Sequence, residues 1–128
     1  MSTAIVLVAH GSRDPGWAQG LQDVREAVVL AHPDVAVELA YLEFVQPTLE
    51  QVVRDCCDRG VTRLQVIPLF LGIGHHVRVD LPNRLDALRS VHPELQLHAL
   101  PALGAWPQLH AMVAACAGTF AQAERAGG

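Results

Sequence analysis

Apolar runs and helical patterns alternate along the whole chain. Four short runs rich in branched side chains have the length and continuity of strands that are buried on both faces. They cover residues 4–9, 35–42, 64–71 and 95–100. Each is followed by a segment with apolar residues at helical spacing, at 17–31, 47–59, 81–91 and 107–122. Strands that alternate with helices predict one parallel sheet with right-handed crossovers.

Prolines and a glycine indicate where the helices begin and end. Pro15, Pro47 and Pro82 lie where a first helical turn is expected, and proline is well tolerated there. Gly60 suits the position just after the end of a helix. Asp80 precedes Leu-Pro and is interpreted as a helix cap. We expect one domain over residues 1–128, with 123–128 as a frayed tail.

The composition indicates which residues form the core and favours an oligomer. The chain has 128 residues, of which 51% are hydrophobic and only 5% aromatic, so the core must be aliphatic. The charged fraction of 17% lies below the average of about 25%. A small domain with few charges favours burial of apolar surface in a partner. Together with the alternation of strands and helices, this composition predicts an α/β fold with helices packed on a four-stranded parallel sheet.

Charge and residue usage exclude several functions. The net charge of −4 leaves no basic stripe for nucleic acid. The nine cations are all arginine, which excludes Schiff-base chemistry and a P-loop. No apolar run approaches the roughly 20 residues of a membrane span, and residues 1–9 do not resemble a signal peptide. The three cysteines form no C-x-x-C pair and suggest reduced thiols in the cytoplasm.

Histidines and a carboxylate follow three of the four expected strands. His10 comes after the first strand, Glu43 after the second, and His75–His76 after the third. In parallel sheets, ligands bind beyond the carboxyl ends of the strands. These side chains are therefore expected at one edge of the sheet. Neighbouring residues usually point in different directions, so we expect one histidine of the pair to face the site.

The chemistry of this set favours a divalent metal ion. Two imidazoles and a carboxylate suit Co²⁺, Ni²⁺, Fe²⁺ or Zn²⁺, and three ligands with open positions are typical of a catalytic site. Gly11, Ser12 and Arg13 form a turn that can hold an anion. Without the neighbouring histidines, Glu43 is as readily interpreted as an ordinary exposed side chain as it is a metal ligand.

Several stretches resemble one family. They are residues 7–13 (LVAHGSR), 41–49 (YLEFVQPTL), 67–77 (IPLFLGIGHHV) with 80–82 (DLP), and Leu103-Gly104 followed by Pro107 and Leu109. In this order, and over nearly the whole chain, they resemble the small single-domain sirohydrochlorin chelatases of the CbiX type, within the class II chelatase group.

The resemblance implies a three-layer α/β/α, flavodoxin-related half-domain that pairs as a homodimer. It implies ATP-independent insertion of Co²⁺, or of Ni²⁺ or Fe²⁺ in relatives, into sirohydrochlorin, with no organic cofactor. The metal ligands it implies are His10, His76 and Glu43, and catalysis would rest on His10 and Glu43. His75 occupies a position that is often small in the family and remains an alternative ligand.

The substrate is rich in carboxylates, while this chain is acidic overall. Arg13 and Arg78, with Ser12 and His75, are therefore the expected substrate-binding residues. The same ligands could instead serve a non-catalytic metal or tetrapyrrole carrier. A histidine phosphatase is a weaker alternative, because Ala9 stands where that family has an arginine before His-Gly.

Overall fold

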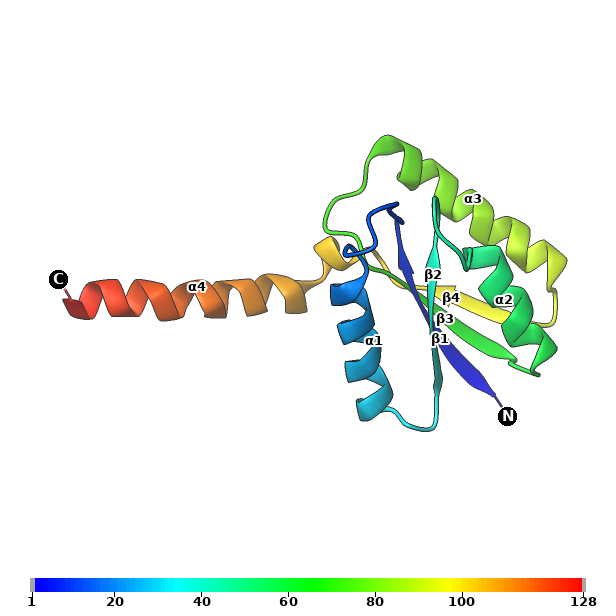
Figure 1. Cartoon of the computed structure of the whole chain (residues 1–128), viewed down its shortest axis with the longest axis horizontal. Helices are drawn as coiled ribbons and strands as arrows, with labels where there is room; N and C mark the ends of the chain where they lie inside the picture. Colours follow the sequence, from blue (N-terminus) through cyan, green and yellow to red (C-terminus); the bar gives the residue numbers. More distant parts are fainter. Residues whose placement is uncertain (1, 128) are drawn as a thin grey trace.

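The computed structural model describes residues 2–127, which form four strands and four main helices (Figure 1). The strands are β1 (Thr3–Ala9), β2 (Ala36–Tyr41), β3 (Arg63–Pro68) and β4 (Gln96–Ala99). The helices are α1 (Gln19–Ala31), α2 (Leu49–Asp58), α3 (His75–Val91) and α4 (Pro107–Gly127), with a short 3₁₀ turn η1 (Leu103–Ala105) before α4. No helix within the described range is long and apolar enough to span a bilayer.

The sheet is wholly parallel, with the strand order β2-β1-β3-β4. The order reverses at β1, since β2 lies on one side of it and β3 on the other. Helix α1 lies on one face of the sheet, and α2 and α3 lie on the other (Figure 1). The predicted three-layer α/β fold is confirmed, and the crevice between the carboxyl ends of β1 and β3 is the expected ligand position.

The main core lies between the sheet and the α2–α3 layer. Alternate residues of β1 point into it, and apolar residues of both helices cover them. Its fully buried side chains include Val6, Val8, Leu49, Val53 and Leu64. The core is aliphatic, as the scarcity of aromatic residues predicts.

Pro15 and Pro47 lie before α1 and α2, which begin at Gln19 and Leu49, so neither proline occupies the predicted first turn. Helix α3 begins six residues before the predicted start, which corrects two further predictions. Its cap is Gly74, and Pro82 lies inside the helix. Asp80 is therefore not a cap; its carboxylate lies 3.5 Å from Nη1 of Arg84 within the helix. Pro82 cannot donate to the carbonyl of Arg78, but both residues are exposed, so water can satisfy that group. Val77, Leu81 and Leu85 are spaced four residues apart, and all three pack in or against the core. This helical spacing of apolar residues outweighs the preference of proline for the first turn.

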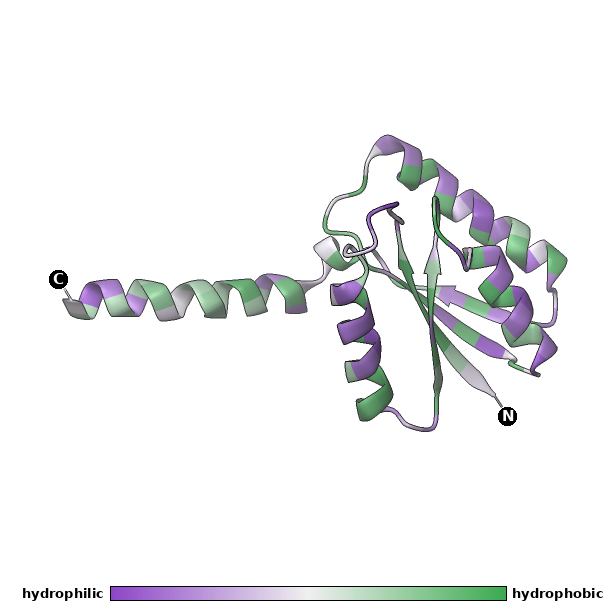
Figure 2. Ribbon diagram, viewed as in Figure 1, coloured by the Kyte–Doolittle hydropathy of each residue, from purple (hydrophilic) through white to green (hydrophobic). Residues whose placement is uncertain are grey.

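Helix α4 projects away from the rest of the molecule (Figure 1). It has no buried residue, and it ends at Gly127, five residues beyond the predicted end at Gln122. The added turn contains alanines with Glu124 and Arg125, which are good helix formers. Gly128 lies outside the described residues. Most of α4 is apolar up to its last turns, although it touches little else of its own chain (Figure 2).

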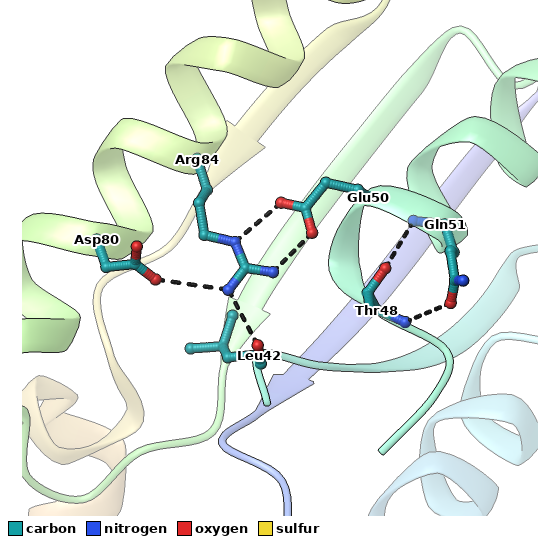
Figure 3. Close-up of polar contacts among 6 residues, drawn as sticks. All are labelled: Leu42, Thr48, Glu50, Gln51, Asp80 and Arg84. Carbon is teal, nitrogen blue, oxygen red and sulfur yellow. Dashed lines mark hydrogen bonds and ion pairs between the residues drawn. The ribbon is translucent and has the colours of Figure 1, made fainter. Parts of the chain in front are cut away.

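An arginine–carboxylate pair ties α2 to α3 (Figure 3). Arg84 donates from Nε to Oε2 of Glu50 at 2.9 Å and from Nη2 to Oε1 at 2.6 Å. The hydrogen bonds from Arg84 lower the pKa of the Glu50 carboxyl below its usual value, against the opposing effect of burial. The same pair raises the pKa of Arg84. The pair is therefore ionised and bidentate, which is the strongest geometry for such a contact.

This pair predicts an acid-sensitive contribution to stability. Because folding lowers the pKa of Glu50, the contribution is present above pH 4.5 and is lost as the pH falls through the lower pKa of the folded state. We expect Glu50→Gln to reduce the free energy of unfolding at pH 7 by about 1 kcal/mol, near the upper end for a partly exposed pair. Urea denaturation at pH 7 and pH 3 should show the difference from wild type shrinking at the lower pH. The exposed Glu94 offers a control, Glu94→Gln, for which a shift as large as that of Glu50→Gln would contradict the assignment.

Candidate metal-binding site

Three of the predicted side chains meet at the carboxyl edge of the sheet. Oε1 of Glu43 lies 3.8 Å from Nε2 of His10 and 3.9 Å from Nε2 of His76. His10 follows β1, Glu43 follows β2, and His76 is the second residue of α3. The carboxylate thus stands between two imidazoles, at the point where the strand order reverses.

The backbone fixes His10 and Glu43 relative to each other. The carbonyl oxygen of His10 accepts hydrogen bonds from the N–H groups of Leu42 at 3.2 Å and Glu43 at 2.9 Å. Gly11 adopts a φ of +109°, and a Cβ atom there would lie 1.8 Å from the carbonyl oxygen of Glu43. Only glycine lets the two loops pass this closely. Phe44 has a φ of +68°, a rare conformation for a bulky residue, and turns the chain sharply after Glu43.

A second glycine supports the segment that leads to the histidine pair. The N–H of Gly104 donates to the carbonyl of Phe70 at 2.9 Å. A Cβ atom at Gly104 would lie 1.7 Å from the carbonyl oxygen of Leu71. Gly104 therefore lets η1 pack closely against the connection between β3 and α3. That connection ends at Gly74, which caps the helix that begins with His75 and His76.

The three donors are close but do not form a preformed metal cage. Within residues 2–127, no three His, Cys, Asp or Glu side chains are arranged to hold a metal ion as they stand. Two ligands of a tetrahedral ion at ordinary bond lengths lie about 3.4 Å apart, a few tenths of an ångström less than the two distances at Glu43. The side chains of His10, Glu43 and His76 are 44%, 37% and 75% exposed. With side chains this exposed, packing does not block rotation of the two imidazoles toward an ion.

The other predicted site residues make no ion pair with Glu43 in the described part of the chain. Within residues 2–127, the imidazole of His76 lies 3.9 Å from the Glu43 carboxylate, whereas His75 forms no ion pair with it. Oγ of Ser12 accepts from the N–H of Asp14 at 3.1 Å and so shapes its own turn. The guanidinium of Arg13 lies over the ring of Phe44, 4.7 Å from its centre, which keeps it beside the Glu43 loop. Arg78 lines a cavity of about 310 Å³ between α3 and the end of β4, and none of His10, Glu43 and His76 lines this cavity.

Two features of the site were not predicted from the sequence. One is the close contact of Gly104 with Leu71, although Leu103-Gly104 is among the stretches that resemble the family. The other is Arg84, whose Nη1 donates to the carbonyl of Leu42 at 3.2 Å, directly before Glu43. Its distance from Leu42 in sequence leaves no local signal of the contact.

Comparison with known proteins gives one family. The CbiX family model matches residues 4–117. A sirohydrochlorin cobaltochelatase of Methanocaldococcus jannaschii is 36% identical over 89 residues, which are 70% of this chain and 62% of that protein. The chain spans 57 to 63% of the length of the curated cobaltochelatases that it matches first.

Solved structures agree with the fold. The crystal structure of a cobalamin biosynthesis CbiX protein from Marinobacter aquaeolei VT8 matches with a TM-score of 0.80 and 28% identity, over 94% of this chain and 98% of that one. The sirohydrochlorin chelatase SirB from Bacillus subtilis subspecies spizizenii, in complex with cobalt, matches with a TM-score of 0.66 and 29% identity. That match covers 80% of this chain and 44% of SirB.

The close approach of Gly11 to Glu43 can be tested by adding one methyl group. We expect Gly11→Ala to destabilise the protein by more than the roughly 1–3 kcal/mol of left-handed strain, because its Cβ also collides with a backbone oxygen. Gly60→Ala is the matched control, since Gly60 has a φ of +90° but open space around its Cβ. Urea denaturation of both variants should give the larger loss for Gly11→Ala. Equal losses of unfolding free energy in the two variants would contradict this, because they would mean that the loops of Gly11 and Glu43 can move apart without cost.

Proposed function

The chain belongs to the CbiX family, and on this premise we propose that it is a chelatase that inserts a divalent metal ion into sirohydrochlorin without ATP. The single observation that carries the proposal is the placing of Glu43 between His10 and His76 at the edge of the sheet. The names of the related proteins, sirohydrochlorin cobaltochelatases, support both the reaction and Co²⁺ as the first candidate. Ni²⁺ and Fe²⁺ remain candidates because the donor set suits them equally.

The geometry suits delivery of a metal ion. His10, His76 and Glu43 would hold the incoming ion, which is a substrate, in a site open to solvent on one side. Three ligands leave positions for water and then for the nitrogens of the tetrapyrrole. An ion held by so few, exposed groups can leave for the macrocycle, whereas a closed cage would retain it.

Insertion also releases two protons, one from each of two pyrrole N–H groups. The metal takes the place of these protons, so the charges balance when a base accepts them. We assign this role to Glu43 and His10, because each is free to accept a proton as the ion leaves it for the macrocycle. Ser12, Arg13, His75 and Arg78 are proposed to bind the carboxylates of the substrate, and Arg13 has the best support, since it is held beside the Glu43 loop.

A homodimer is part of the proposal, and helix α4 supports it. Residues 107–123 contain no Asp, Glu, Lys or Arg. Met112, Val113 and Phe120 are all more than half exposed. A long helix with this much apolar surface is marginal alone in water and is stabilised by packing. A second copy offers the same surface in return, as twofold symmetry requires. The free thiols of Cys56, Cys57 and Cys116 fit a reducing compartment, so we place the protein in the cytoplasm.

The chelatase proposal predicts faster metallation in the presence of the protein. The absorbance of sirohydrochlorin with Co²⁺ should convert to the metallated spectrum faster with wild-type protein than without it. His10→Ala should reduce this rate and weaken Co²⁺ binding at least tenfold, or about 1.4 kcal/mol. His76→Ala should do the same, and His75→Ala should have a smaller effect, because only His76 approaches Glu43.

His32→Ala is the control for these variants, since exposed His32 follows α1 at the opposite edge of the sheet. Tight Co²⁺ binding without any acceleration would identify a carrier rather than a chelatase. Full activity in both His10→Ala and His76→Ala would refute the site. Parallel assays with Ni²⁺ and Fe²⁺ rank the metals.

The dimer proposal predicts a mass twice that of one chain by light scattering. Val113 and Phe120 are seven residues apart and therefore share one face of α4. We expect the double change Val113→Glu, Phe120→Glu to shift the protein to monomers, whereas Gln122→Glu, on the same helix, should leave the dimer intact. A monomeric wild-type protein would contradict the proposal.

A further inference from the structure

Arg84 joins both helices of the core layer to the loop of Glu43 (Figure 3). It bonds both carboxylate oxygens of Glu50 on α2, the carbonyl oxygen of Leu42 and the carboxylate of Asp80 on its own helix. Its side chain is only 20% exposed. A guanidinium that serves three acceptors from three segments has little freedom to move.

The contact with Leu42 acts on the peptide group that leads into Glu43. The C=O of that peptide belongs to Leu42 and accepts from Arg84 at 3.2 Å. Its N–H belongs to Glu43 and donates to the carbonyl of His10 at 2.9 Å. One peptide plane is thus held at its two ends, by the loop of His10 on one side and by α3 on the other. A peptide held at both ends cannot rotate without breaking one of the bonds.

The same helix carries the third donor. His76 lies two turns before Arg84 in α3, so the position of α3 relative to the Glu43 peptide sets the distance between His76 and Glu43. The bidentate bond to Glu50 also fixes the guanidinium relative to α2. His10, Glu43 and His76 are therefore connected through two hydrogen bonds of one peptide group.

We infer that Arg84 is a positioning residue of the site: it fixes the Leu42–Glu43 peptide against α3 and so sets the separation of the three metal-binding side chains. This inference rests on the proposed function, because it assigns Arg84 a role in metal binding. Arg84 touches no donor itself and acts through the backbone and the helix. Changes in such supporting contacts typically weaken metal binding 10- to 100-fold.

A second arginine of α3 provides a matched control. Arg89 also donates to a backbone carbonyl, that of Leu97 in β4 at 3.1 Å, and to a carboxylate, that of Asp86 at 3.0 Å. Both arginines thus attach α3 to the sheet side of the molecule through a carbonyl. Only the carbonyl bonded by Arg84 adjoins a proposed metal ligand. An arginine with a purely structural role should therefore affect stability alone, and this is the result we expect for Arg89.

The test compares Arg84→Gln with Arg89→Gln by titrating the full-length protein with Co²⁺ and recording the visible absorption of the bound ion. We expect Arg84→Gln to weaken Co²⁺ binding about tenfold or more and to change the absorption bands, which report the arrangement of the ligands. Arg89→Gln should bind Co²⁺ within twofold of wild type, with unchanged bands. Thermal unfolding of both variants separates these effects from a general loss of stability.

Arg84→Lys covers the case in which Arg84→Gln does not fold. Lysine keeps the charge beside Glu50, but its single nitrogen cannot reproduce the four bonds that the guanidinium makes from three separate nitrogens. We therefore expect stable protein with weakened Co²⁺ binding and altered bands. Wild-type affinity and bands in either folded Arg84 variant would overturn the inference and leave the chelatase proposal intact. Absence of His10-dependent Co²⁺ binding in the wild-type protein would overturn both.

Discussion

The carbonyl oxygen of His10 accepts two hydrogen bonds from the chain that leaves β2, and the rest of the site depends on this junction. Parallel pairing of β1 with β2 ends at Ala9 and Tyr41. The two bonds to His10 extend that alignment past the last strand residues. They hold Glu43 beside His10 although neither residue belongs to the sheet.

Close contact at this junction restricts the residues around it. Gly11 must lack a Cβ atom, because the carbonyl of Glu43 occupies the space where one would lie. The carbonyl of Leu42, turned the other way, would face the α2–α3 layer without a backbone partner, and Arg84 supplies the missing donor. A buried or half-buried carbonyl left without a donor is costly, so a polar side chain at this point is expected on physical grounds. The guanidinium of Arg84 thus donates the hydrogen bond that the Leu42 carbonyl needs and, through the same contact, couples α3 to the peptide of Glu43.

The parts of this structure that the sequence predicts are those with a local cause. Continuous apolar runs mark the four strands, and strand-end polar residues such as His10 and Glu43 follow from the rule for parallel sheets. The early start of α3 also had a local signal, in the spacing of Val77, Leu81 and Leu85. A proline at 82 hid that signal, because its usual place in the first turn suggested a later start.

Other features have no local cause and could not be predicted in this way. Arg84 reaches Leu42 across 42 positions of sequence, and Gly104 meets Leu71 from another loop. Such contacts depend on the strand order, which brings these segments together only after the sheet has formed. The projecting course of α4 is also a property of the assembled fold, since nothing in its helical pattern shows which surface its apolar side chains cover.

The three proposed donors combine two residues held by backbone bonds with one more exposed partner, and this division fits the proposed release of a metal ion. His10 and Glu43 are held through backbone bonds, whereas the side chain of His76 is 75% exposed at the start of a helix. Drawing His76 toward an ion held beside Glu43 would therefore involve rotation of its side chain rather than movement of the sheet. The opposite movement releases the ion, at little cost, because water can replace the histidine. A site with three rigid donors would bind more tightly but would oppose the transfer, so the exposure of His76 is itself an argument for delivery over storage.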